Sequence, residues 1–259
     1  MPSSRPAGPS EAAAERIAKV MARAGLCSRR DAERWIAEGR VKVDGKLLTG
    51  PAFNVAPAAR ITVDGNPIPA QAPTRLWRYH KPRGVLTTAR DPEGRPTVFD
   101  ALPKDLPRVL AVGRLDLDSE GLLLLTNDGE LKRRLELPAT GWARCYRVRV
   151  HGRVDQARLD ELKPGVTVDG IRYGPVEAAL ERQQGGNAWL AMRLTEGKNR
   201  EVRRICEHLG WTVNRLIRVA YGPFQLGDLP PGAVEEVPTR LLRRQIGADA
   251  AHAHHRRRA

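Results

Sequence analysis

Apolar positions near the start of the chain follow the period of an α-helix. Three of them keep the spacing of one helix face: Ile17, Val20 and Met21. Gly25 is placed to end this first helix. Ser28 then has the character of an N-cap, and Asp31 three residues later completes a capping-box pattern. The pattern therefore predicts a second helix over about residues 29–38.

The period changes to two after the second predicted helix. Residues 41–47, VKVDGKL, alternate between apolar and polar and turn at an Asp-Gly pair, which is typical of a β-hairpin. Residues 61–65, ITVDG, repeat the pattern. Two short helices followed by small strands predict a compact α+β module over residues 15–70.

A short linker over residues 71–74 leads to a longer unit over residues 75–242, in which Gly and Pro separate short apolar runs. Strands are predicted at 76–79, 109–112, 122–125, 144–150, 188–194 and 213–219. Helices are predicted at 131–135, 157–162 and 200–209. Because strands outnumber helices, we expect an α+β domain on a mixed or antiparallel sheet.

The net charge of the chain indicates what kind of partner it binds. The 259 residues carry a formal charge of +14, and the pI is near 10.5. Such an excess favours a polyanionic partner, with RNA or DNA first and an anionic membrane surface second. The ends have no apolar period, so we expect a disordered lead over 1–14 and a basic disordered tail over 243–259.

Other sequence features indicate the cellular location and bear on membrane and metal partners. No apolar run is long enough to span a bilayer, and the first residues lack the apolar core of a signal peptide. The cysteines are far apart and lack metal-ligand spacing: Cys27, Cys145 and Cys206. We therefore expect a cytoplasmic protein with reduced thiols that serve packing, no membrane partner and no metal site. The tail histidines have no carboxylate or thiol beside them: His252, His254 and His255.

The densest group of charges lies on a Gly-bounded loop, GRLDLDSEG at residues 113–121, which leads into an apolar run that predicts a buried strand. Arg114 is followed by three alternating acids: Asp116, Asp118 and Glu120. Three chemistries fit this pattern, namely paired carboxylates for acid–base work, a divalent-metal site, and one nucleophilic or basic carboxylate held by arginine. The adjacent arginine and the basic chain favour the third, but do not choose among the acids.

A second cluster, EGKNREVRRICEHLG at residues 196–210, predicts an amphipathic helix. At roughly 100° per residue, Arg203 lies at the margin of the apolar stripe, where it can turn toward a carboxylate. Arg200 and Arg204 lie opposite the stripe and, with Lys198, suit RNA phosphates.

Two further segments carry candidate binding groups. Tyr146 lies on an alternating strand and offers a ring that can stack on a base. Lys81 and Arg83 lie at the rim of a predicted Pro-Gly turn. Arg29 and Arg30 lie on the second predicted helix of the small module, where they can meet a phosphate backbone.

The small module resembles the S4 RNA-binding domain, on residues 26–32, LCSRRDA, and 39–45, GRVKVDG. The rest of the chain resembles the pseudouridine synthases that act on ribosomal RNA. This resemblance rests on residues 81–84, 113–129, 145–148 and 196–210, and it covers residues 15–240 in order. The loop over residues 91–100, DPEGRPTVFD, most resembles the subgroup called large-subunit enzyme B.

The resemblance implies an isomerase that converts uridine to pseudouridine within ribosomal RNA, most often large-subunit RNA, without cofactor or metal. It implies that Asp116 is the catalytic aspartate, that Arg203 pairs with it and keeps it ionised despite burial, and that Tyr146 lies against the target base. Arg114 matches a position that helps to hold a flipped nucleotide. A monomer is expected. The alternatives are a small-subunit enzyme, a non-catalytic rRNA-binding assembly factor and a carboxylate-pair hydrolase.

Overall fold

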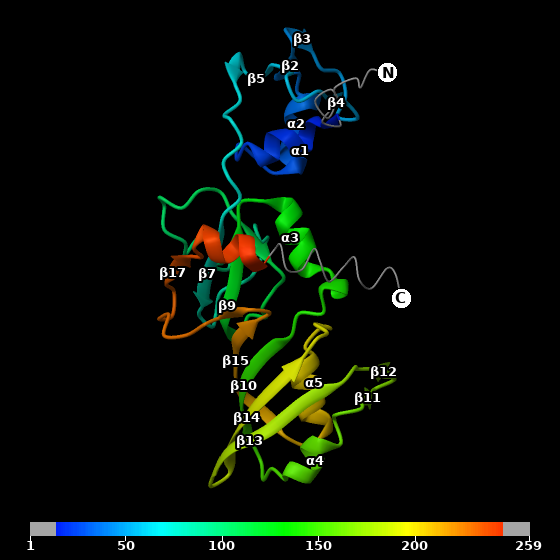
Figure 1. Ribbon diagram of the computed structural model, residues 1–259, viewed down its shortest axis with the longest axis vertical. Helices are drawn as coiled ribbons and strands as arrows, with labels where there is room; N and C mark the ends of the chain where they lie inside the picture. Colours follow the sequence, from blue (N-terminus) through cyan, green and yellow to red (C-terminus); the bar gives the residue numbers. More distant parts are fainter. Residues whose placement is uncertain (1–13, 246–259) are drawn as a thin grey trace, which may run out of the picture. The chain divides into compact units, whose positions relative to one another are not determined.

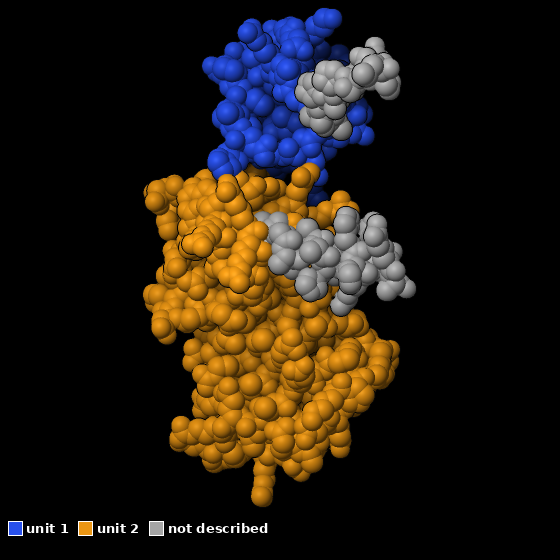
Figure 2. All heavy atoms as spheres, in the orientation of Figure 1, with its two compact units in different colours: residues 1–73 blue, residues 74–259 orange. Residues whose placement is uncertain are grey.

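The computed structural model describes residues 14–245 (Figure 1), which divide into two compact units between Pro73 and Thr74 (Figure 2). Thr74 Oγ1 donates a hydrogen bond to the Asp128 carboxylate at 2.6 Å and so attaches the first residue of the second unit to its own core. Residues 1–13 and 246–259, with the three tail histidines, lie outside the described residues.

The first unit follows the hydrophobic pattern closely. Helix α1 spans Ile17–Arg23 and helix α2 spans Arg29–Ala37. The predicted capping box is confirmed, since Ser28 accepts from the Asp31 amide and Asp31 accepts from the Ser28 amide. A four-stranded sheet has the order β3-β2-β5-β6, and a separate pair joins β1 to β4. The bounds are β1 Glu15–Arg16, β2 Val41–Val43, β3 Lys46–Leu47, β4 Asn54–Val55, β5 Ile61–Val63 and β6 Asn66–Pro67.

The second unit is built on one mixed sheet of the order β13-β14-β10-β15-β9-β7-β17, with β8 and β16 paired at its side. All pairings in this sheet are antiparallel except that of β9 with β15. The α+β fold on a mixed sheet is therefore confirmed. The bounds are β7 Leu76–Lys81, β8 Leu110–Val112, β9 Ser119–Thr126, β10 Arg144–His151, β13 Val176–Gln184, β14 Asn187–Leu194, β15 Thr212–Tyr221, β16 Phe224–Gln225 and β17 Val234–Glu236.

Short helices accompany this sheet. They are α3 Gly129–Glu136, the 3-10 turn Pro138–Thr140, α4 Gln156–Asp160 and α5 Glu201–His208, with the small pair β11 Thr167–Val168 and β12 Ile171–Arg172. Residues 239–245 are also helical, and Leu242 is only 3% exposed. Residues 243–245 are thus ordered helix, unlike the disordered tail predicted from residue 243.

Strand β9 is the centre of the domain, because all eight of its residues are buried. Leu123 and Leu125 pack into one hydrophobic cluster, and Leu122 and Leu124 pack into another on the opposite face. Full burial of each leucine contributes about 1.5–3 kcal/mol. The loop over residues 113–118 therefore leads directly into a fully buried strand.

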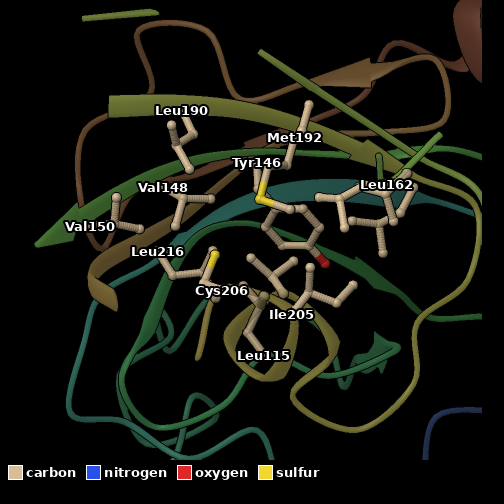
Figure 3. Close-up of a cluster of buried hydrophobic side chains, with 14 of the residues drawn as sticks. Leu115, Tyr146, Val148, Val150, Leu162, Leu190, Met192, Ile205, Cys206 and Leu216 are labelled. Atoms are coloured by element: carbon tan, nitrogen blue, oxygen red, sulfur yellow. The ribbon is translucent and has the colours of Figure 1, made fainter. Parts of the chain in front are cut away.

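Helix α5 packs on the face of the sheet that carries the first of these clusters. Figure 3 shows Ile205 and Cys206 from α5 lying beside Tyr146 and Val148 from β10 and Leu216 from β15. Both helix residues are at most 1% exposed. This packing fixes α5 relative to β10 and β15.

Candidate active site

A cavity of about 510 Å³ lies within the second unit. Six segments line it: the loop over 113–119, the end of α3, the start of β10, the end of β14, the segment over 197–202 and strand β15. Its size lies within the range of about 300–1,000 Å³ that is typical of small-ligand sites. The polar groups on its wall are Arg114, Asp116, Ser119, Glu136, Arg144, Tyr146, Lys198, Asn199, Arg200, Glu201, Arg218 and Tyr221.

The loop that carries Asp116 is fixed by hydrogen bonds to its backbone. The Gly113 amide donates to the Glu136 carboxylate at 2.6 Å. Thr87 Oγ1 donates to the Leu115 carbonyl at 2.8 Å, and Leu115 itself is buried. These bonds fix both ends of the segment over residues 113–115, which directly precedes Asp116.

Three buried cations donate to carbonyl oxygens of the same loop. Lys81 Nζ donates to the carbonyls of Asp116 at 3.1 Å and Ser119 at 2.8 Å. Arg203 Nη2 donates to the Asp118 carbonyl at 3.1 Å, and Arg218 Nη1 donates to the Arg114 carbonyl at 3.5 Å. Cationic donors strengthen hydrogen bonds to carbonyls. The loop is therefore held in one conformation by charges that lie beneath it.

Asp116 differs from the buried carboxylate expected from the sequence. Its side chain is 38% exposed, and its ion contact is with Arg200, whose Nη1 lies 4.0 Å from Oδ2. Arg203 turns inward as the helical wheel predicted and is 7% exposed, but among the ion pairs of residues 14–245 it has none with Asp116. Its donors go instead to the carbonyls of Asp118 and Val213, because backbone carbonyls are the nearer acceptors.

The other two acids of the loop have separate roles. Glu120 is the buried carboxylate, at 6% exposed, and it forms an ion pair with Arg215 of the neighbouring strand β15. Asp118 is exposed. Glu120 therefore joins two strands, whereas Asp118 faces solvent.

The segment before α5 has an unusual backbone. Arg200 is the N-cap of the helix and adopts a left-handed conformation with φ 52°, which is uncommon for a residue with a side chain. The buried Glu201 carboxylate accepts from the Lys198 amide at 2.9 Å and closes this turn. Burial raises the pKa of Glu201 and lowers the pKa of Arg203. The turn thereby presents Arg200 to the cavity.

The other predicted side chains lie as follows. Tyr146 lines the cavity and is 9% exposed, with its ring among the apolar residues of Figure 3. Arg83, Arg114, Lys198 and Arg200 are exposed, whereas Arg204 is half-buried. Arg29 and Arg30 are exposed on α2 of the first unit.

Lys81 is a correction to the sequence analysis. It was expected at the rim of a turn in contact with RNA, but it is 0% exposed and bonded to three carbonyls, that of Pro82 included. Burial lowers the pKa of Lys81 to about 8. A side chain with no accessible surface offers nothing to RNA, so its role is to support the loop.

Sequence reasoning missed seven polar cavity groups, of which four are charged: Glu136, Arg144, Glu201 and Arg218. One had a signal, because Arg218 shares a strand face with Leu216 and Ala220, and a charge on an apolar face is unusual. Arg144 packs its guanidinium 4.8 Å over the Tyr221 ring, a contact that needs the fold to be seen.

The sequence places this fold and site in a known family. Residues 75–208 match the family described as RNA pseudouridylate synthase, and residues 15–61 match the S4 domain. The chain therefore belongs to the RNA pseudouridine synthases, isomerases that convert uridine to pseudouridine in RNA, and it carries an N-terminal S4 domain, an RNA-binding module.

Sequence similarity to relatives extends over most of the chain. It is 48% identical over 228 residues to an RNA pseudouridine synthase of Rickettsia felis, covering 88% of this chain and 99% of the relative. It is 47% identical over 233 residues to the ribosomal large subunit pseudouridine synthase B of Salmonella typhi, covering 86% of this chain and 79% of that protein. A crystal structure of a pseudouridylate synthase shares the fold, with a TM-score of 0.62 at 23% identity, covering 88% of this chain and 98% of that one.

Two further features of the described residues bear on the predicted membrane and metal partners. No helix within residues 14–245 has the length and apolar character needed to cross a bilayer. Across the same residues, no three His, Cys, Asp or Glu side chains gather where they could hold a metal ion.

Proposed function

We propose that the protein converts a uridine of large-subunit ribosomal RNA to pseudouridine, and that Asp116 is the carboxylate that carries the reaction. The observation that carries this proposal is the cavity, whose wall places Asp116 together with Tyr146 and Arg200. The similarity to the enzyme named for the large ribosomal subunit supports the choice of RNA.

The reaction needs one anchored carboxylate and a pocket that excludes the rest of the RNA. The bond between N1 of uracil and C1′ of ribose breaks, the base turns, C5 joins C1′, and the proton lost from C5 is balanced by one gained at N1. Substrate and product are isomers, so no cofactor enters the balance. Asp116 acts on the ribose, on the base or on the proton, while Tyr146 lies against the turned base.

Electrostatics suit a flipped nucleotide in this cavity. Arg114, Lys198 and Arg200 line it and are exposed, so they can meet the phosphates beside the target base. Arg83 extends the basic region, since it lies near enough to Arg203 to lower its pKa, and Arg204 is the next residue of α5. Arg203 supports the loop carbonyl of Asp118 while its charge stays close to Asp116. Extrusion of the base costs a few kcal/mol, which these contacts offset.

Arg29 and Arg30 of the S4 domain are proposed to bind a separate part of the same RNA. Both are exposed on α2. They contribute affinity through phosphate contacts and play no part in bond breaking. We propose that the protein works as a monomer in the cytoplasm.

The test is a pseudouridine map of ribosomal RNA from cells that lack this gene, complemented with wild type or with Asp116→Asn. One large-subunit site is expected to disappear and to return only with wild type. Full restoration by Asp116→Asn would refute the role of Asp116. Loss of a small-subunit site instead would refute the choice of RNA while leaving the chemistry in place.

A further inference from the structure

Arg218 carries a buried positive charge that the proposed reaction leaves without a role. The side chain is 3% exposed and lines the same cavity wall as Asp116 and Tyr146. Within residues 14–245 it has no carboxylate partner in an ion pair, and its Nη2 is buried without a hydrogen-bond partner. An unpaired buried charge costs several kcal/mol, so its presence calls for an explanation.

The contacts of Arg218 connect the two ends of the loop that carries Asp116. Its Nε donates to the Leu122 carbonyl at 2.8 Å, just after the loop, and its Nη1 donates to the Arg114 carbonyl at 3.5 Å, just before Asp116. Its backbone pairs in parallel register with Gly121. One residue of β15 thus contacts both the start and the end of the loop.

Other cavity groups lie next to this guanidinium without neutralising it. The Cζ atom lies 5.2 Å over the ring of Tyr221, which also carries the Arg144 guanidinium at 4.8 Å. The charge on Arg218 also lowers the pKa of Lys81, so the two buried cations lie close enough to repel each other. The fold thus places two like charges under one loop, and both of them donate hydrogen bonds to its carbonyl oxygens.

We propose that Arg218 is a positioning residue of the isomerase, one that sets where Asp116 stands relative to the nucleotide by fixing both ends of its loop. The inference rests on the proposed role of Asp116. Two different nitrogens of the guanidinium bond the two ends of the loop, so the positioning depends on the shape of the group and not on its charge alone. A misplacement of about 1 Å at a reacting group costs about 100-fold in rate. Since Arg218 has almost no accessible surface, RNA does not bind to it directly.

The test compares Arg218→Gln and Arg218→Lys with wild type on a large-subunit rRNA fragment that the wild type modifies. Single-turnover rate at saturating RNA and the RNA dissociation constant are measured separately. We expect the rate to fall about 100-fold for Gln and about 10-fold or more for Lys, with the dissociation constant and its salt dependence unchanged within about twofold. A structural role alone would lower the melting temperature but leave the rate of the folded enzyme unchanged.

Arg193→Gln is the matched control, because it removes a positive charge from an exposed side chain of the same sheet. It is expected to leave the single-turnover rate unchanged. Should the Arg218 variants not fold, Thr87→Val removes another bond to the same loop without a change of charge and is expected to give the same split between rate and affinity.

Two results would overturn the inference. Full rate with Arg218→Lys would show that charge suffices and geometry does not matter. A weaker RNA dissociation constant at unchanged rate would make Arg218 a contact for RNA. Failure of the wild type to modify large-subunit rRNA would refute the proposed function instead, and the comparison would then be run on the RNA that it does modify.

Discussion

A single ammonium group decides much of the local geometry around Asp116. Lys81 Nζ bonds the carbonyls of Pro82, Asp116 and Ser119, and water does not reach it. A hydrogen bond from a charged donor contributes about 1.5–3 kcal/mol, and its loss leaves the acceptors unsatisfied. The conformation of the Asp116 loop therefore depends on a residue that touches no substrate.

Lys81→Met tests this dependence at the residue scale. The methionine keeps the volume but leaves three carbonyls without this donor, so we expect unfolding free energy to fall by about 2–4 kcal/mol and turnover by at least about 10-fold. RNA affinity should not change, because the side chain is buried. Urea denaturation, single-turnover kinetics and filter binding measure the three quantities. Weaker RNA binding at unchanged turnover would show that Lys81 reaches RNA after all.

Protonation of Lys81 also makes stability depend on pH. Burial lowers the pKa of Lys81 from 10.5 to about 8 in the folded protein. Between these values the unfolded chain binds more protons than the folded one, so unfolding free energy rises with pH through that window. Below about pH 8 both states carry the proton and the dependence disappears. The difference in stability between wild type and Lys81→Met, measured by urea at pH 7–10, should grow above pH 8. A constant difference would contradict the shift.

The residue scale is where the sequence predicts least. Helical periodicity was enough to predict that Arg203 turns inward, because its place on the wheel depends on local geometry alone. Its partner was not predictable, since the Asp118 carbonyl comes from a loop 85 positions away along the chain. Lys81 was misjudged because a lysine beside a Pro-Gly turn is usually exposed, and only the pairing of β7 with β9 buries it.

At the scale of elements, a glycine makes the parallel pairing of β9 and β15 possible. Gly121 has φ 102°, and a Cβ there would lie 2.3 Å from the Arg218 carbonyl oxygen. No side chain fits between these two backbones. The close approach of the strands, and with it the position of the loop over residues 113–119, requires glycine at this position.

Gly121→Ala is expected to lower unfolding free energy by about 3–5 kcal/mol and to abolish turnover, because the strands must separate. Gly232→Ala is the control, since its φ of 83° is similar but its Cβ would meet nothing within 4 Å. It should cost only the backbone strain, about 1–2 kcal/mol. Thermal melts of both variants separate the two causes. Equal costs would show that strain, and not the clash, matters at Gly121.

Element prediction succeeded where apolar residues dominate. The six predicted strands and three predicted helices of the second unit are all present, because a strand such as β9 or β14 must bury its side chains. Strands β11, β12, β13, β16 and β17 were not predicted, and the two longest of these are β13 and β17. The last four residues of β13 are exposed and polar, and β17 has two exposed glutamates, so neither shows a strong period of two. Their existence depends on a neighbouring strand that supplies hydrogen bonds.

At the scale of the whole molecule, exposed positive charge is distributed over both units. The chain carries +14, and exposed arginines occur on α2 as well as around the cavity. Composition was sufficient to predict a polyanion as the partner. The identity of that polyanion was not contained in the charge, since any phosphate backbone satisfies it.

Removing two of these charges tests whether the S4 domain contributes to RNA affinity and not to the chemical step. Arg29→Ala with Arg30→Ala is expected to weaken RNA binding by about 10-fold at 0.1 M salt and to reduce the slope of log K against log salt by about 1–2. The single-turnover rate at saturating RNA should stay the same. Arg34→Ala on the same helix is the control, because its guanidinium is already paired with Asp31 and Glu38. A lower saturated rate in the double variant would place the S4 domain in the chemical step.

The order of the strands has a consequence for how the protein is made. Strand β9 lies beside β15, although about ninety residues separate them in the chain. Helix α5 directly precedes β15 in the sequence. Contacts of such long range form slowly. The first unit, in contrast, is complete by residue 73. During synthesis the S4 domain can therefore fold before the strands that support the Asp116 loop are complete, so an RNA-binding module would form before the proposed active site.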